Sequence, residues 1–119
     1  MSTLKTNTIK NTDDVEMYLA KAWVNFNGTG TVAIRAAGNV SSITDNGTGT
    51  YTVNFTTSMP DINFGASSFL TDDGVTNRAI NEQGPFGTYR TTSSIRVTAH
   101  NTNASGSVDA QGVYVAIFR

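Results

Sequence analysis

Two copies of the tetrapeptide Asn-Gly-Thr-Gly, at residues 27–30 and 46–49, strongly constrain how this chain can fold. In each case a strand-like run precedes the Asn-Gly pair and another follows it. Asn-Gly favours the type I′ turns of tight β-hairpins, because both central residues of such a turn need a positive φ. The repeated tetrapeptide therefore predicts two β-hairpins with type I′ turns.

Residues 28–33 also fit G-x-G-x-x-[GA], the phosphate-binding fingerprint of dinucleotide-binding folds. That fingerprint needs a helix that opens at its third position and an acidic residue about 20 residues further on. Residues 31–34, Thr-Val-Ala-Ile, are a poor start for a helix, and no alternation of strands and helices follows. We therefore interpret the glycines as turn residues and expect no cofactor.

Period-two alternation of apolar and polar residues predicts antiparallel strands with one buried face over residues 23–26, 51–55 and 95–99. The strand expected at residues 113–118 differs, because both of its faces are apolar. Val113, Val115 and Ile117 share one face, and the other carries Tyr114 and Phe118. Such a strand needs cover on both faces, from a second sheet, a helix or another subunit.

The region before these strands predicts a short helix. Asp13 is a suitable N-cap, and Glu16 three residues later completes a capping box. Apolar residues follow at helical spacing for about two turns. This stripe consists of Val15, Tyr18, Leu19 and Ala22.

Composition supports a β-rich domain. The chain has 119 residues, which is the size of one domain, and only 14% of them are charged. Thr, Asn, Ser and Gly are abundant, as in β proteins with many turns. We predict an all-β protein, an antiparallel β-sandwich of jelly-roll-like form over residues 22–119. An N-terminal arm and the short helix would occupy residues 1–21.

Charge and hydropathy argue against several classes of partner. The net charge is −1 and no Lys/Arg run occurs, so we expect no nucleic-acid ligand. No apolar run approaches the roughly 18 residues of a membrane span, and the N-terminus lacks the apolar core of a secretory signal. The absence of cysteine fits folding in a reducing cytosol.

Several longer motifs resemble a widespread group of bacteriophage tail-fibre and appendage proteins. They are AKAWVNFNGTGTVAIR, NVSSITDNGTGTYTVNFTTSMP and the terminal VYVAIF, with STLKTNTI near the start. The match is loose over residues 2–10 and close over residues 20–60 and 113–118. The resemblance implies a virion protein assembled in the host cytoplasm, with a small trimeric β domain and no implied enzyme activity.

The function that we expect from this resemblance is a tail fibre or receptor-binding tip that mediates attachment to the host. The expected partners are two further copies in a homotrimer, other virion proteins, and a glycan or protein of the host surface. A capsid decoration or head-fibre protein is one alternative, and a carbohydrate-binding module is another. In the arm, Leu4 and Ile9 are the candidates for docking to the virion. The candidate trimer interface comprises Val15, Tyr18, Leu19, Tyr114 and Phe118.

The loop at residues 81–90 is the predicted receptor site, through Phe86, Tyr89 and Arg90. Sugars stack their C–H faces on aromatic rings and form hydrogen bonds with amides and guanidinium groups, so the loop has suitable chemistry. Its glycines and proline predict an irregular, projecting segment. The alternative is a connector whose aromatic side chains pack back into the core.

Residues for catalysis or metal binding are few. His100 is the only histidine, so one chain cannot form a Cys/His metal site, and no nucleophile elbow occurs. Residues 71–77 resemble a calcium loop only faintly and fit ordinary turn chemistry. Glycoside cleavage needs two carboxyl groups in a groove, which a small lone domain hardly provides. The available carboxylates are Asp61, Asp72, Asp73, Glu82 and Asp109. We therefore predict neither an enzyme nor a metal site.

Overall fold

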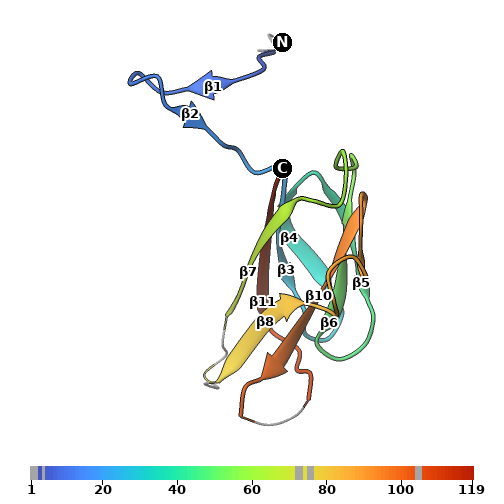
Figure 1. Cartoon of the computed structure of the whole chain (residues 1–119). Helices are drawn as coiled ribbons and strands as arrows, with labels where there is room; N and C mark the ends of the chain where they lie inside the picture. Colours follow the sequence, from blue (N-terminus) through green and yellow to red (C-terminus); the bar gives the residue numbers. More distant parts are fainter. Residues whose placement is uncertain (1–2, 4, 72–73, 75–76, 104–105) are drawn as a thin grey trace.

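The computed structural model describes residues 3, 5–71, 74, 77–103 and 106–119. Within these residues the chain forms β strands and no helix (Figure 1). The strands are β1 (Ile9–Lys10), β2 (Glu16–Met17), β3 (Ala22–Asn27), β4 (Ala33–Gly38), β5 (Val40–Asp45), β6 (Thr50–Phe55), β7 (Gly65–Thr71), β8 (Arg78–Glu82), β9 (Arg90–Thr91), β10 (Ser94–Asn101) and β11 (Gly112–Phe118). The prediction of an all-β chain is confirmed.

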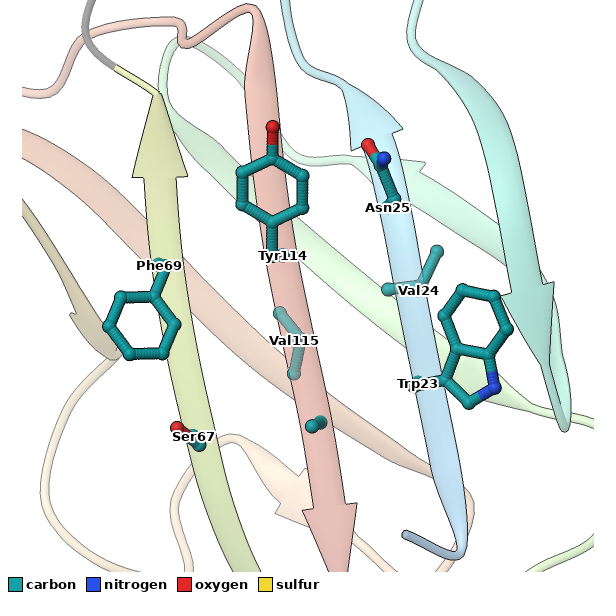
Figure 2. Close-up of a pocket in the computed structure, with 8 residues that line it drawn as sticks. Trp23, Val24, Asn25, Ser67, Phe69, Tyr114 and Val115 are labelled. Atoms are coloured by element: carbon teal, nitrogen blue, oxygen red, sulfur yellow. The ribbon is translucent and has the colours of Figure 1, made fainter.

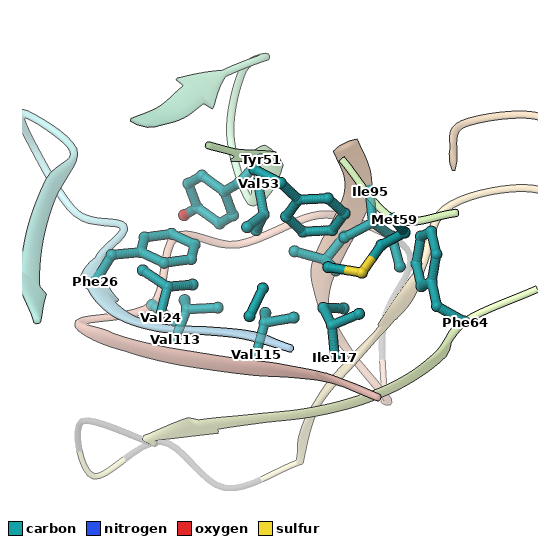
Figure 3. Packing of buried hydrophobic residues seen from close by; sticks show 14 residues of the cluster. Val24, Phe26, Tyr51, Val53, Met59, Phe64, Ile95, Val113, Val115 and Ile117 are labelled. Carbon is teal, nitrogen blue, oxygen red and sulfur yellow. The ribbon is translucent and has the colours of Figure 1, made fainter. Parts of the chain in front are cut away.

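Two antiparallel sheets make up the body of the protein. One has the strand order β4-β3-β11-β7, and the other has the order β5-β6-β10-β8, with β9 beside β10. The sheets pack in a sandwich-like manner around one apolar core (Figures 1 and 3). The hairpins β3–β4 and β5–β6 each stay within one sheet. Antiparallel pairing is confirmed, and the finer jelly-roll-like connectivity stays a prediction.

Alternate residues of four central strands fill the core (Figure 3). The rings of Phe26 on β3 and Tyr51 on β6 meet edge to face, with centroids 5.2 Å apart. Full burial of each large apolar side chain stabilises the fold by about 1.5–3 kcal/mol. The period-two pattern therefore identified the inward face correctly. Its buried members include Val24, Phe26, Tyr51, Val53, Ile95, Val97, Val113, Val115 and Ile117.

Strand β11 lies between β3 and β7, in the middle of its sheet. Val113, Val115 and Ile117 point into the core and are buried. The opposite face of β11 carries Tyr114 and Phe118, and Phe118 is exposed. The second sheet therefore covers one face of this strand, and the outer face stays accessible in the part of the chain that the structure describes.

The predicted helix at residues 13–22 is wrong. The chain forms a small hairpin there, in which β1 pairs with β2. The Asn11 side chain accepts hydrogen bonds from the backbone N–H groups of Asp13 and Val15, both at 3.0 Å. Asp14 adopts a φ of 64°. Asn and Asp favour such turns because their side chains replace backbone hydrogen-bond partners, and two helical turns offered too little to compete.

The N-terminal hairpin stands away from the body, at the end where the C-terminus lies (Figure 1). Its large apolar side chains are exposed, and they include Ile9, Val15, Met17, Tyr18 and Leu19. The separate helical stripe that we expected for trimer contacts does not exist, although Val15, Tyr18 and Leu19 of that stripe are accessible. Leu4, the other candidate for virion docking, lies outside the described residues. We call residues 5–19 the arm.

Both predicted hairpins exist, but the predicted type I′ turns are wrong. The β3–β4 loop spans residues 28–32 and the β5–β6 loop spans residues 46–49. In the first loop the positive φ, 59°, belongs to Gly30, and neither Asn27 nor Gly28 has one. Gly28 meets a packing need instead, because a Cβ there would lie against the Tyr51 hydroxyl and 2.8 Å from the Ala110 carbonyl oxygen.

Candidate functional site

Three aromatic side chains lie together on the outer surface of the β4-β3-β11-β7 sheet (Figure 2). Trp23 comes from β3, Tyr114 from β11 and Phe69 from β7. Tyr114 pairs directly with Phe69 across the sheet. Phe69 is 68% exposed and Trp23 is 44% exposed, which is far more than any core residue. We call Trp23, Phe69 and Tyr114 the aromatic face.

Two glycines allow the aromatic rings to lie against the sheet. A Cβ on Gly38 would collide with the Trp23 indole, so the indole lies over Gly38 of the neighbouring strand β4. A Cβ on Gly112 would lie 2.7 Å from the Tyr114 hydroxyl oxygen. Figure 2 shows the rings of Trp23, Tyr114 and Phe69 broad side on. Rings presented in this way form a platform rather than a set of projecting knobs.

A shallow hollow of about 340 Å³ lies between the three rings. Its floor is formed by small side chains, because Ala116 pairs with Trp23 on one side and with Ser67 on the other. Asn25 lies at its edge and accepts a hydrogen bond of 3.3 Å from Arg35. The hollow has the size of a small ligand pocket. Its lining residues, all uncharged, are Trp23, Val24, Asn25, Ser67, Phe69, Tyr114, Val115 and Ala116.

Sequence reasoning did not bring these residues together. The alternation of β3 could have placed Trp23 opposite Val24 and Phe26, and the alternation of β11 placed Tyr114 on the face opposite Val113. Phe69 gave no such signal, because residues 65–71, Gly-Ala-Ser-Ser-Phe-Leu-Thr, show no clear period. The pairing of β11 with both β3 and β7 is a long-range contact that the local pattern does not encode.

The predicted receptor residue Arg90 is buried. Its side chain donates to both carboxylate oxygens of Glu82, at 2.7 and 2.5 Å, and to the carbonyl oxygens of Ile62 and Phe64, at 2.8 and 2.7 Å. Only 7% of Arg90 is exposed. The hydrogen bonds to the Glu82 carboxylate stabilise the charged guanidinium and raise the Arg90 pKa above its ordinary value. The guanidinium therefore holds the structure together, which corrects the expectation that it faces a receptor.

The other two predicted receptor residues are exposed to different degrees. Phe86 is 66% exposed, and its ring centroid lies 4.8 Å from the Arg90 guanidinium carbon. Tyr89 is less exposed, and the Arg96 guanidinium lies 4.6 Å from its ring centroid. Cation–π contacts of this kind attach both rings to the body. Their role in binding a receptor stays a prediction.

Two of the candidate carboxylates, Asp61 and Asp109, serve intramolecular contacts. Asp61 pairs with Arg119, and the hydrogen bond from this arginine lowers the Asp61 pKa to about 2. Asp109 accepts hydrogen bonds from the Gly49 backbone at 2.7 Å and from the Tyr51 hydroxyl at 3.1 Å. Burial, more than this hydrogen bond, raises the Tyr51 pKa above its ordinary value. These groups stabilise loops.

The remaining candidate residues have no grouping that suggests catalysis. His100 lies on β10 and is partly buried. No cluster of three or more His, Asp or Glu residues that could hold a metal occurs among the residues with described positions. Asp72 and Asp73 lie outside the described residues, so the faint calcium loop has no structural account here. No helix of the described chain is long and apolar enough to cross a membrane.

The expected trimer contacts divide between two places. Val15, Tyr18 and Leu19 lie on the arm, and Phe118 lies at the end of β11 beside the root of the arm, where the Lys21 backbone N–H donates to the Ile117 carbonyl oxygen. Tyr114 lies further along β11, on the aromatic face.

A comparison with protein-family models, curated sequences and solved structures found no match. Function therefore has to be argued from the residues and their geometry.

Proposed function

We propose that this chain is a structural subunit of a bacteriophage appendage, a tail fibre or receptor-binding tip that attaches the virion to its host. The observation that carries the proposal is the arm. It presents apolar side chains on a hairpin that stands off a well-packed body. A hairpin of two short strands is at best marginally stable in water, so it gains stability only when a partner covers it. The resemblance of residues 20–60 and 113–118 to phage appendage proteins indicates that the partner covering the arm is another virion protein or another copy of the chain.

In this proposal the arm provides both the docking contact and the contacts between copies. Ile9 belongs to the docking side. Val15, Tyr18, Leu19 and the nearby Phe118 associate the copies into a homotrimer. Three arms around one axis would remove from water apolar surface that a single chain leaves exposed. The body then projects from the virion, with its outer surfaces available to the host.

The location of the chain on the virus particle tests this function. Antibodies against the body should label the tail fibres or tail tip of the phage that encodes the chain, seen by electron microscopy. Antibody labelling of the capsid instead would refute the proposal and favour the alternative of a capsid decoration or head-fibre protein. Purified particles that lack the chain altogether would refute a virion role and leave the carbohydrate-binding module as the remaining alternative.

The arm itself is tested by a deletion. A chain that starts at Ala20 should fold, because none of the described residues before Ala22 is a buried core residue. In sedimentation equilibrium the shortened chain should have the mass of a monomer, whereas the full chain should have three times that mass. It should also fail to join particles. Incorporation of the shortened chain would show that docking uses another surface.

A further inference from the structure

We propose that the aromatic face is a binding site for a neutral glycan, with sugar rings stacked on Trp23, Tyr114 and Phe69. This inference rests on the proposed attachment function, because it names the chemical class of host-surface molecule that the body contacts. It also moves the expected ligand from the loop at residues 81–90 to the outer surface of the β4-β3-β11-β7 sheet.

The orientation of the rings is what a sugar needs. A pyranose ring carries C–H bonds on its broad faces, and these bonds are attracted to the electron-rich face of an aromatic ring. The Trp23 indole lies over Gly38 and the hydroxyl end of Tyr114 lies over Gly112, and Figure 2 shows both rings broad side on. Phe69 adds a third ring from the neighbouring strand, and Figure 2 shows all three around one hollow.

Polar groups accompany the rings at positions suited to sugar hydroxyls. The Tyr114 hydroxyl, the Ser67 hydroxyl and the Asn25 amide all belong to residues that line the hollow. The hydrogen bond from Arg35 to the Asn25 carbonyl oxygen orients the amide and leaves its NH₂ group as a donor. Apolar pockets with a few placed polar groups are the usual form of small-ligand sites.

The charge of the hollow selects the class of glycan. None of its eight lining residues is charged. A carboxylated or phosphorylated sugar would give up water around its charge, and no lining residue would supply the opposite charge, since Arg35 lies at the edge of the hollow, where it donates to Asn25. Burying the charge there costs free energy. A neutral sugar has no such penalty. The site should therefore prefer neutral glycans to acidic ones.

A second copy of this chain is the competing occupant, and the exposed aromatic area does not favour it. An aromatic side chain offers about 150–250 Å² of surface, so the exposed parts of Trp23 and Phe69 together amount to roughly 250 Å². A stable protein interface buries about 800 Å² on each partner. A sugar chain needs only a narrow platform, whereas a dimer contact would need much more surface than these two rings provide.

The aromatic face carries its own reporter, because Trp23 is the only tryptophan of the chain. The experiment adds maltohexaose, cellohexaose, mannohexaose or chitohexaose to the purified full-length protein and records tryptophan fluorescence. Calorimetry gives the dissociation constant independently. Hexagalacturonic acid serves as the acidic comparison. At least one neutral hexasaccharide should cause a saturable change, and the acidic one should not.

Three variants locate the binding. Phe69→Ala should weaken it by about tenfold or more, which corresponds to ~1.4 kcal/mol. Ser67→Arg, on the edge strand β7, should block the hollow while every ring remains. Phe86→Ala is the matched control, because Phe86 is as exposed as Phe69 but lies on the loop at residues 81–90. This control should bind as the parent does. Circular dichroism should show that all three variants are folded.

Several results would overturn the proposal. One is the absence of saturable binding by every neutral hexasaccharide. Another is equal loss of binding in Phe86→Ala, which would return the site to the loop at residues 81–90. A third is dissociation of an oligomer by Phe69→Ala, which would assign the face to a contact between copies. Because these tests use purified protein, they can fail while antibody labelling still places the chain on the virion, and the reverse also holds.

Discussion

Replacing Arg90 by Met should destabilise the protein, because the Arg90 side chain joins the loop at residues 81–90 to the body. Methionine has a similar length and no charge. It would leave the Glu82 carboxylate and the carbonyl oxygens of Ile62 and Phe64 without the donors that they have in the parent protein. It would also remove the cation that lies 4.4 Å from the Phe64 ring centroid.

The magnitude follows from the burial of the two partners. Removing one member of a fully buried ion pair costs about 3–5 kcal/mol. The Glu82 side chain is 23% exposed, so water can solvate part of the abandoned carboxylate. We therefore expect Arg90→Met to lower the free energy of unfolding by about 2–4 kcal/mol. For a domain of this size that corresponds to a melting temperature lower by roughly 10 °C.

Urea denaturation followed by circular dichroism measures this effect. Phe86→Ala is the control on the same loop, and it should change the free energy of unfolding by less than about 1 kcal/mol, because it loses only an exposed cation–π contact. If Arg90→Met unfolds at the same urea concentration as the parent, the guanidinium does not stabilise the loop. Arg90 would then again be a candidate for receptor contact.

Three further predictions concern backbone packing and pH. Gly28→Ala should lower the free energy of unfolding by about 1–3 kcal/mol in urea denaturation, because the new Cβ meets Tyr51. Gly30→Ala should lower it by about 1 kcal/mol, for the φ of 59° alone, and a larger loss in Gly30→Ala than in Gly28→Ala would contradict the packing role. Burial raises the Tyr51 pKa, so above about pH 10 this tyrosine ionises in the unfolded chain before it ionises in the folded one, and the free energy of unfolding should fall as pH rises. Urea denaturation at several pH values should show a smaller fall for Tyr51→Phe than for the parent. Carbon-detected NMR should find the Asp61 pKa at about 2, so that its stabilising contribution is present above pH 3.8 and disappears as pH falls toward 2; an unchanged value in Arg119→Gln would contradict the ion pair as its cause.

Local sequence patterns predicted the strands well because alternation is a local property. Residues 51–55, 95–99 and 113–117 each bury every second side chain as expected. A half-buried strand needs this pattern wherever the strand lies in the sheet. The hairpins at residues 27–30 and 46–49 were also predicted, since glycine and asparagine punctuate strands in most contexts.

One error arose where two local structures compete, and another where a contact between two strands was missed. Residues 13–22 carry a helical stripe and a capping box, but Asn11 just before them offers an Asx turn, and the turn is what forms. Arg90 has the chemistry of a ligand-binding residue, and the sequence does not reveal that Glu82 lies within reach of it. Neither outcome can be read from spacing, because each depends on what the rest of the chain places nearby.

The sequence by itself determined the β character of this protein and the inward face of each main strand. Only the tertiary structure decided the rest. It buried Arg90 and placed Trp23, Phe69 and Tyr114 on one outer surface, although these three residues are far apart in the chain. The physical reason is that alternation tells which way a side chain points, whereas the neighbours that it meets depend on which strands pair and in what register.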